Sequence, residues 1–203
     1  MRHPALPALL VMLFALSGCA ALTKNMAQEP VDRDHGSRTF GAFVEDGNIE
    51  RKIKVNLARA SEALDQSHIV VVSFNGNVLL AGEVASDELR VQAENIAARV
   101  RHVRHVHNEL KLSGDSGVLS RVNDGWLTTK LKTRLFVDGD APGMRTKVVT
   151  VSGIVYLMGL LTRAQADTAV QVAYQVYGVQ KIVKVFEYVD EPPAVYPDTR
   201  DDP

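Results

Sequence analysis

Cysteine is almost missing from this sequence. Cys19 is the only one among 203 residues, so no disulfide can form within the chain. A strong charge of one sign is also missing: the formal net charge is −1 at pH 7, and whole-chain electrostatics indicates no particular partner. The charge is unevenly distributed, however. Residues 46–112 contain nine acidic and nine basic residues, whereas residues 122–189 contain five acidic and eight basic ones, so the second half is basic.

Motifs that carry chemistry are absent as well. The sequence has no nucleophile motif, no glycine-rich phosphate loop and no paired carboxylates with a supporting base, so we expect neither enzyme activity nor a cofactor. His105 and His107 share one face of a predicted strand but lack a further ligand at a recognisable spacing. Asp138 and Asp140 are too few ligands for calcium. We therefore predict no metal site.

The N-terminal segment has the composition of an export signal. Arg2 precedes an almost wholly apolar run over residues 5–16, which is shorter than the ~20 residues needed to span a bilayer. The run ends in Leu16-Ser17-Gly18-Cys19, which resembles the bacterial lipobox. That resemblance implies a signal peptide over residues 1–18 and acylation of Cys19, by palmitate or a similar chain. Because Ala20 is not aspartate, it also implies sorting to the outer membrane, with the protein facing the periplasm.

Two flanking segments lack a pattern that could build a core. Residues 19–44 have mixed charge and no sustained periodicity, and we expect a lipidated flexible tether. Residues 190–203 combine four prolines with five acidic residues, which predicts a disordered tail.

An internal repeat organises the residues between these segments. Asp46-Gly47-Asn48-Ile49 aligns with Asp124-Gly125-Trp126-Leu127, and residues 75–82 align with residues 152–159. The offset between the copies changes by only two residues along the repeat. We therefore predict two copies of one module, over residues 45–113 and 122–189.

Each copy predicts a helix, two strands, a second helix and a third strand. The first helix has apolar residues at every fourth position and an aspartate expected to cap it, which is Asp46 in copy one and Asp124 in copy two. Asn75-Gly76 predicts a tight hairpin, with Gly82 closing its second strand. A strand–helix–strand passage favours a parallel pair. We thus predict an α+β fold, in which each module has a small three-stranded mixed sheet with two helices on one face.

The repeated pattern resembles the BON domain family. The matching features are the stripe on the first helix, the turn glycine before an apolar strand, and the late Val-x-x-Val/Ile. Copy two contains Tyr177-Gly178-Val179, whereas copy one has His102 in place of that glycine, so its tight helix end is less secure. A lipobox followed by two such modules is similar to dual-BON outer-membrane lipoproteins. This resemblance implies binding of anionic phospholipid, such as phosphatidylglycerol, through the first helix of the second module. It also implies support of outer-membrane integrity and a location at the division site.

The first helix of copy two, expected over residues 123–137, contains the candidate site. Leu127, Leu131 and Leu135 share one side and should face the core. The rest of the helix combines an indole with basic groups, which suits a surface in contact with anionic headgroups. The residues assigned to this phospholipid-binding surface are Trp126, Thr129, Lys130, Thr133, Arg134, Phe136 and Val137. Copy one has Asn48 in place of the tryptophan, so we expect membrane contact by copy two alone.

Three alternatives stay open from the residues alone. Trp126 could be a packing residue, buried between the modules or under a loop. The same surface could dock a protein of outer-membrane assembly or division. The chain could also act as a stress-response chaperone in the periplasm. Nucleic acid is not expected as a partner of a protein exported to the envelope.

Overall fold

Two copies of one arrangement of helices and strands follow each other in the computed structural model, which describes residues 38–112 and 118–190. The signal peptide, Cys19, residues 20–37 of the tether and residues 191–203 of the tail lie outside these ranges. The first module contains α2 (Phe40–Ala60), α3 (Glu62–Gln66), β1 (Ile69–Phe74), β2 (Asn77–Val84), α4 (Asp87–Ala98) and β3 (His105–Leu112). The second contains α5 (Val118–Val137), the 3-10 turn η1 (Gly143–Arg145), β4 (Thr146–Val151), β5 (Ile154–Leu161), α6 (Arg163–Tyr174) and β6 (Lys181–Tyr188). No helix within the described ranges is long and apolar enough to cross a membrane.

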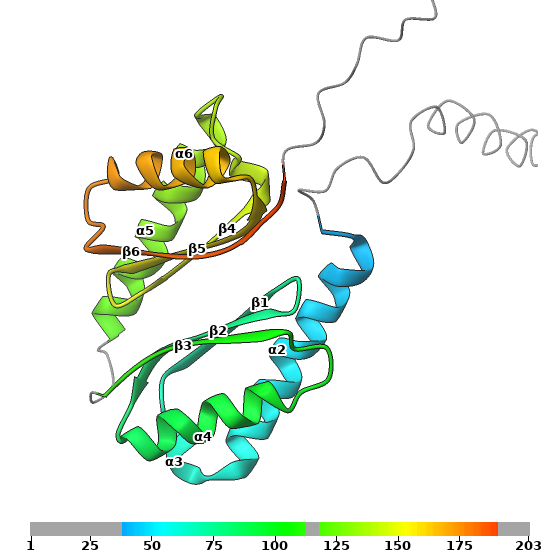
Figure 1. Ribbon diagram of the computed structural model, residues 1–203. Coiled ribbons are helices and arrows are strands. Elements are labelled where there is room, and N and C mark those ends of the chain that lie inside the picture. Colours follow the sequence, from blue (N-terminus) through cyan, green and yellow to red (C-terminus); the bar gives the residue numbers. More distant parts are fainter. Residues whose placement is uncertain (1–37, 113–117, 191–203) are drawn as a thin grey trace, which may run out of the picture. The chain divides into compact units, whose positions relative to one another are not determined.

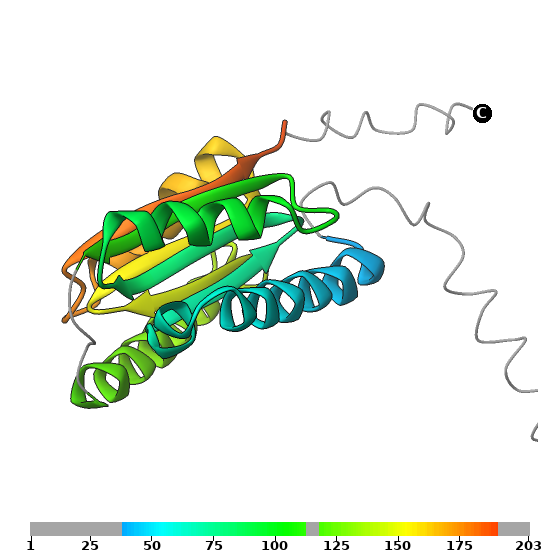
Figure 2. The same cartoon turned by 90° about the horizontal axis from the view of Figure 1, so that it is seen from below.

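Each module is built on a three-stranded sheet, in the order β1-β2-β3 or β4-β5-β6. The first two strands pair antiparallel and the last two pair parallel, so the predicted mixed sheet is confirmed. One face of the first sheet is covered by α2 and α4, and one face of the second by α5 and α6 (Figures 1 and 2). The predicted α+β class is confirmed.

The hairpins of both modules have the predicted tight turns. Their central residues all have positive φ, 52° and 74° at Asn75 and Gly76, and 50° and 74° at Ser152 and Gly153, as the twist-compatible two-residue turn requires. The prediction that Gly82 closes its strand is wrong, because β2 continues to Val84. A Cβ atom at Gly82 would collide with the carbonyl oxygen of His68. The glycine is thus needed for a close backbone approach within the hairpin.

The two aspartates predicted to cap the first helices instead lie inside them. α2 begins at Phe40, with Thr39 as its N-cap, and α5 begins at Val118. The helix formed by copy two therefore starts five residues before the predicted Asn123. Asp46 and Asp124 sit at the seventh position of their helices, and both are buried.

Both aspartates bind the hairpin turn of their own module. Asp46 accepts hydrogen bonds from the backbone N–H groups of Asn75 (2.8 Å) and Gly76 (2.9 Å). Asp124 accepts from the N–H groups of Ser152 (2.7 Å) and Gly153 (2.8 Å). A tight turn leaves these N–H groups without strand partners, and a buried acceptor satisfies them. Each carboxylate consequently ties the first helix of a module to the tip of its hairpin.

The end of the second helix is the place where copy one departs from the family pattern. His102 nevertheless has a positive φ of 70°, as Gly178 does in copy two, where φ is 105°. Its Nδ1 atom lies 3.0 Å from Oε1 of Glu45. The left-handed turn thus forms in both modules although one of them lacks glycine there.

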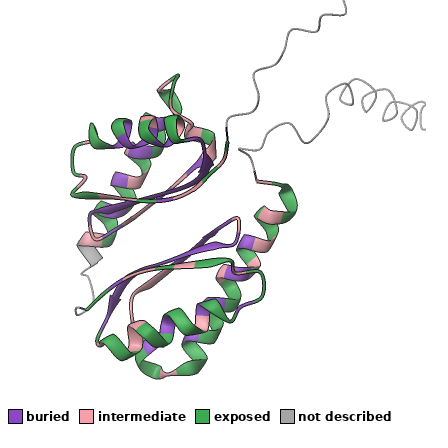
Figure 3. Cartoon of the chain, viewed as in Figure 1, coloured by how far each residue is buried: buried purple, intermediate pink, exposed green. Residues whose placement is uncertain are grey.

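The two modules pack their uncovered sheet faces against each other. A shared apolar cluster includes Leu79 and Ala81 from the first module and Tyr156 and Met158 from the second. The central strands β2 and β5 are therefore buried at every residue (Figure 3). Burial among these side chains raises the pKa of the Tyr156 phenol to about 12. The described residues of both modules belong to one compact unit.

Polar contacts frame this apolar interface. Glu187 on β6 accepts hydrogen bonds from Asn75 (3.1 Å), from Asn77 (3.0 Å) and from both terminal nitrogens of Arg104 (2.9 and 2.7 Å). Partial burial by itself raises the pKa of Glu187, but the hydrogen bonds and the positive charge of Arg104 outweigh it, so the pKa lies below its ordinary value. These contacts add a fixed geometry to the non-directional apolar packing.

Replacement of a turn-binding aspartate should destabilise the protein. We expect Asp124→Ala to lower the free energy of unfolding by about 2–3 kcal/mol, because two backbone N–H groups lose a charged acceptor in a buried place. Urea unfolding followed by circular dichroism measures the change. The control is Asp167→Ala, which removes an acid that is 72% exposed and 3.5 Å from Lys184 and should cost less than about 0.5 kcal/mol. Equal losses in the two variants would contradict the assigned role.

Replacement of Glu187 should have a pH-dependent effect. At pH 7 we expect Glu187→Gln to lower the free energy of unfolding by about 1 kcal/mol, a modest value because Arg104 is partly exposed. The folded-state pKa is depressed, so the stabilisation is fully present above the unfolded-state value of about 4.3 and disappears as pH falls through the folded-state pKa. Urea unfolding from pH 7 to pH 3 should show the difference from wild type closing at acidic pH. A constant difference would show that ionisation of Glu187 is not involved.

Candidate functional site

The orientation of α5 about its own axis is fixed by the buried residues on one face of the helix. Leu127, Leu131 and Leu135 are all at most 2% exposed and pack into the core of the second module, as predicted. Asp124 lies on the same side and holds the hairpin turn. Because residues three to four positions apart share one helix face, these four side chains leave the opposite face to solvent.

The large apolar residues of the predicted site lie on that exposed face. Trp126 is 64% exposed, and Phe136 and Val137 are each 70% exposed. The alternative in which Trp126 packs between the modules or under a loop is therefore wrong. An indole and a phenyl ring open to solvent are costly to hydrate, and apolar groups gathered on an exposed face commonly mark an interaction surface.

The polar residues of the predicted site surround these apolar groups. Thr129, Thr133 and Arg134 are exposed, and Lys130 is half-buried. Lys130 donates a hydrogen bond to the backbone carbonyl of Tyr177 (3.2 Å), and Arg134 donates one to the side chain of Gln175 (3.3 Å). The structure thus brings the whole predicted set onto one helix. We call it the α5 surface, comprising Trp126, Thr129, Lys130, Thr133, Arg134, Phe136 and Val137.

The charged members of the α5 surface, Lys130 and Arg134, are both basic. Asp124 is the only acidic residue of α5, and its carboxylate is buried and engaged by the hairpin turn. Lys132 and Arg134 are exposed and Lys130 is half-buried, and none of the three has an exposed acidic side chain of the same helix beside it. A positive, partly aromatic surface is complementary to an anionic, amphipathic one.

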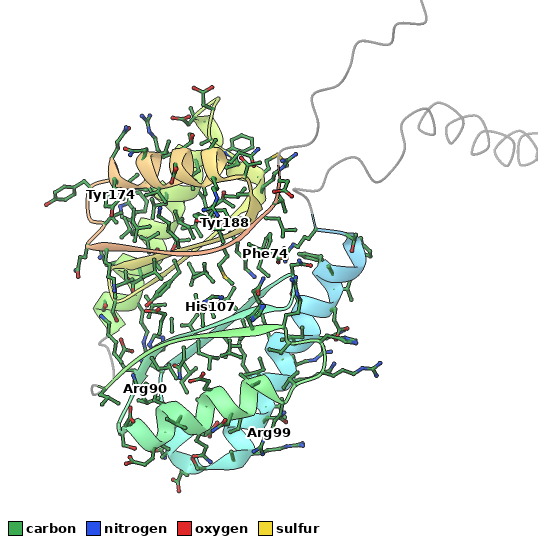
Figure 4. The ribbon with its side chains drawn as sticks, viewed as in Figure 1. Phe74, Arg90, Arg99, His107, Tyr174 and Tyr188 are labelled. Atoms are coloured by element: carbon green, nitrogen blue, oxygen red, sulfur yellow. The ribbon has the colours of Figure 1, made fainter. Side chains whose placement is uncertain are left out.

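Three exposed residues next to the α5 surface were missed from the sequence. Val122 is 65% exposed and precedes Trp126 by one helical turn, but the predicted helix began after it. Tyr174 and Tyr177 are 64% and 93% exposed at the end of α6, and the hydrogen bond from Lys130 to the Tyr177 carbonyl joins that end to α5. Figure 4 shows Tyr174 projecting outward from α6. Spacing could have indicated Val122, whereas the tyrosines come close only through the fold.

The remaining candidate ligands do not assemble a metal site. Within residues 38–112 and 118–190, no three histidine, cysteine or carboxylate side chains are grouped so that they could hold an ion. His107 lies on β3 opposite the interface residue Leu79 (Figure 4). Burial, and secondly the charge of His105, lower the pKa of His107. Both effects favour the neutral imidazole.

The equivalent helix of the first module differs at the decisive position. Asn48 replaces the tryptophan and takes part in a polar network, accepting from Arg51 (2.6 Å) and donating to Glu45 (3.4 Å). This part of α2 is therefore an ordinary solvated helix face. The first turns of α2, however, expose Phe40 (81%) and Phe43 (55%), which lie before the predicted helix.

Comparison with known proteins agrees with this two-module architecture. The BON domain model matches twice, at residues 45–114 and 123–190. The chain is 33% identical over 176 residues to the outer membrane lipoprotein DolP of Haemophilus influenzae, across 87% of this chain and 88% of that protein. It is 35% identical over 164 residues to the 21 kDa hemolysin of Actinobacillus pleuropneumoniae, across 77% and 84%. It is 28% identical over 166 residues to the osmotically-inducible protein Y of Escherichia coli, across 80% and 81%. The predicted resemblance to dual-BON outer-membrane lipoproteins is confirmed, and this chain belongs to the BON domain family, with two copies of the domain.

Proposed function

We propose that this protein is a non-enzymatic lipoprotein of the outer membrane that binds anionic phospholipid through the α5 surface. In this proposal Cys19 carries the lipid anchor, the folded modules face the periplasm, and lipid binding supports outer-membrane integrity at the division site. The observation that carries the proposal is the exposed Trp126, flanked by basic side chains on a helix whose only acid is buried.

The location is supported by relatedness. DolP of Haemophilus influenzae is named an outer membrane lipoprotein, and the match covers 88% of that protein. The segment ending at Cys19, which resembles a lipobox, agrees with the same location in the outer membrane. One acyl chain anchors a protein only weakly, whereas two or more hold it stably. The attachment of more than one acyl chain to Cys19 would therefore keep both modules at the membrane.

The chemistry of the α5 surface suits the headgroup layer. Trp126 combines an apolar ring with one polar N–H, and such residues concentrate at the boundary between headgroups and acyl chains. Lys130, Lys132 and Arg134 would each contribute about 1 kcal/mol of attraction to an anionic surface. Since the anchor raises the local concentration of the module, this modest affinity suffices for stable contact.

A protein partner is the second candidate function, and one observation favours it. Tyr174 and Tyr177 add two exposed tyrosines beside the α5 surface, and tyrosine is enriched at protein interfaces. A photo-crosslinker at position 126 separates the candidates in cells. The lipid proposal expects the main adduct to be phospholipid, whereas a single protein adduct would favour an adaptor in outer-membrane assembly or division.

Replacement of Trp126 by an acid tests the lipid proposal. We expect Trp126→Glu to weaken binding to vesicles containing phosphatidylglycerol by at least about tenfold, because burial of an aromatic side chain is worth ~1.5–3 kcal/mol and the new charge is repelled. Vesicle co-sedimentation measures the loss. Thermal unfolding should be unchanged, since Trp126 packs little against the protein.

The matched control is Val91→Glu, which makes the same kind of change at a residue of α4 that is 47% exposed. This variant should bind vesicles like the wild type. Unchanged binding by Trp126→Glu, or an equal loss in the control, would defeat the proposal.

A further inference from the structure

A groove lined by basic side chains opens where the two modules meet. Its volume is about 430 Å³, within the range of ~300–1,000 Å³ usual for small-molecule sites. The first module contributes Arg38 and Phe43, and the second contributes Lys132 from α5 and the segment Met144–Lys147. The described lining of this groove includes four basic side chains and no carboxylate: Arg38, Lys132, Arg145 and Lys147.

Two of these basic side chains, Arg38 and Lys147, are held in place by contacts with other residues of the protein. The Arg38 guanidinium lies between the rings of Phe43 (4.8 Å) and Phe74 (4.6 Å) and donates to Asp46 (2.8 Å). Figure 4 shows Phe74 at the tip of the first hairpin, near the start of α2. An arginine has five donors, and the ion pair with Asp46 leaves the guanidinium with further N–H groups for a ligand.

Lys147 is fixed in a similar way. Its ammonium group donates to Glu50 (3.1 Å) and to the backbone carbonyl of Ser73 (3.1 Å), both in the first module. Asp46 and Glu50 offset the charges of Arg38 and Lys147. Lys132 forms no hydrogen bond or ion pair with another described side chain, so the groove keeps an excess of positive charge.

Apolar side chains border the same groove. Phe43 and Met144 line it, and Met144 is 89% exposed. Phe40, which is 81% exposed, stacks on Phe43 with 6.4 Å between ring centroids. Met144 and Phe136 also line a neighbouring pocket, whose lining includes Asp138 and Asp140, so the apolar border reaches the α5 surface at Phe136.

The segment that forms this border is placed by Gly143. A Cβ atom there would collide with the carbonyl group of Leu135 and lie 2.9 Å from the Cα atom of Phe136. The absence of a side chain lets the loop press against the end of α5. Met144 and Arg145 are consequently held beside the helix that contains Lys132.

We infer that this groove is a binding site for the phosphate-bearing headgroup of an anionic phospholipid. The inference rests on the proposed function and deepens it, because it assigns headgroup recognition to the groove and interfacial contact to the α5 surface. Arg38, Lys132, Arg145 and Lys147 supply donors for the phosphate, while Phe40, Phe43 and Met144 contact the glycerol and acyl region. The first module thereby takes part in lipid contact through the start of α2, contrary to the expectation that copy two acts alone.

The apolar border is the reason to assign a lipid headgroup and not free phosphate. A site for a soluble anion needs donors only, whereas exposed phenyl and thioether groups beside the donors complement a molecule that is charged at one end and apolar at the other. Both sources share the phosphate group, so an experiment must present each of them separately.

Charge reversal in the groove tests the inference. All variants are made in the full chain with Cys19→Ser, a substitution that prevents acylation. We expect Lys132→Glu/Arg145→Glu to weaken binding to phosphatidylcholine vesicles containing phosphatidylglycerol by at least about tenfold. The matched control is Lys54→Glu/Arg59→Glu, which reverses two charges on the exposed side of α2 outside the groove and should lose less than about threefold. The single variant Lys132→Glu alters an exposed residue that makes no hydrogen bond or ion pair with another described residue, and it should show a smaller loss with unchanged thermal unfolding.

The arms of the experiment separate the possible failures. If the groove variants bind vesicles like the control while Trp126→Glu does not bind, the groove inference falls and the proposed function stands. If Trp126→Glu binds normally, the proposed function falls. A titration with inorganic phosphate, followed by NMR, should shift the groove amides only weakly and leave vesicle binding intact. Saturation of the groove by free phosphate, with loss of vesicle binding, would overturn the assignment to a lipid headgroup.

Discussion

The hydrogen bonds between a buried helical carboxylate and the hairpin turn are the constraint on which the rest of this structure depends. In the second module, Asp124 accepts from the N–H groups of Ser152 and Gly153 and so fixes α5 against the sheet. The leucines at one-turn intervals bury the same side of the helix. Because the inward side is determined in this way, the outward side is determined as well, and Trp126 must face solvent. The same bond also removes the only acidic charge of α5 from the surface.

The packing of the two sheets against each other adds a second level of organisation. Small three-stranded sheets with helices on one face leave the other face uncovered, and each module covers that of its neighbour. Contacts such as Lys147 to Glu50 and Arg104 to Glu187 then fix how the modules meet. The basic groove forms at this junction, where Arg38 of the first module and Lys132 of the second come together although they lie more than 90 positions apart in the sequence. Neither module could form the groove alone.

Much of the fold follows from local patterns in the sequence. The repeat, the four-residue stripes and the Asn75-Gly76 turn predicted the two long helices and the three strands of each module, because these signals depend on neighbouring residues. They did not predict the short α3 or the turn η1. The roles of Asp46 and Asp124 were not predictable in this way, since an aspartate near a helix start suggests a cap until the real start is known. Sheet-to-sheet packing had one visible signal. Strand Ile154–Leu161 is apolar at every position, as expected of a strand buried on both faces, but the pattern does not say what covers it.

In the candidate site, too, some residues could be predicted from local sequence patterns and others only from the tertiary fold. The α5 surface lies on one helix, so helical periodicity was enough to gather its residues. Tyr177 and the groove residues Arg38 and Arg145 come from other elements, and only the tertiary fold brings them near α5. The first turns of α2 were assigned to the tether because residues 19–44 have mixed charge and no sustained periodicity. Sequence periodicity thus located the centre of the site but not its edges.

The most direct measurement uses the fact that the chain contains a single tryptophan, so intrinsic indole fluorescence reports on position 126 alone. Addition of vesicles containing phosphatidylglycerol should shift the emission of Trp126 to shorter wavelength and expose it to quenching by brominated acyl chains. Vesicles of phosphatidylcholine alone should cause neither change. An emission spectrum that stays the same with phosphatidylglycerol vesicles, with no quenching by the brominated lipid, would contradict the claim that the α5 surface enters the membrane interface.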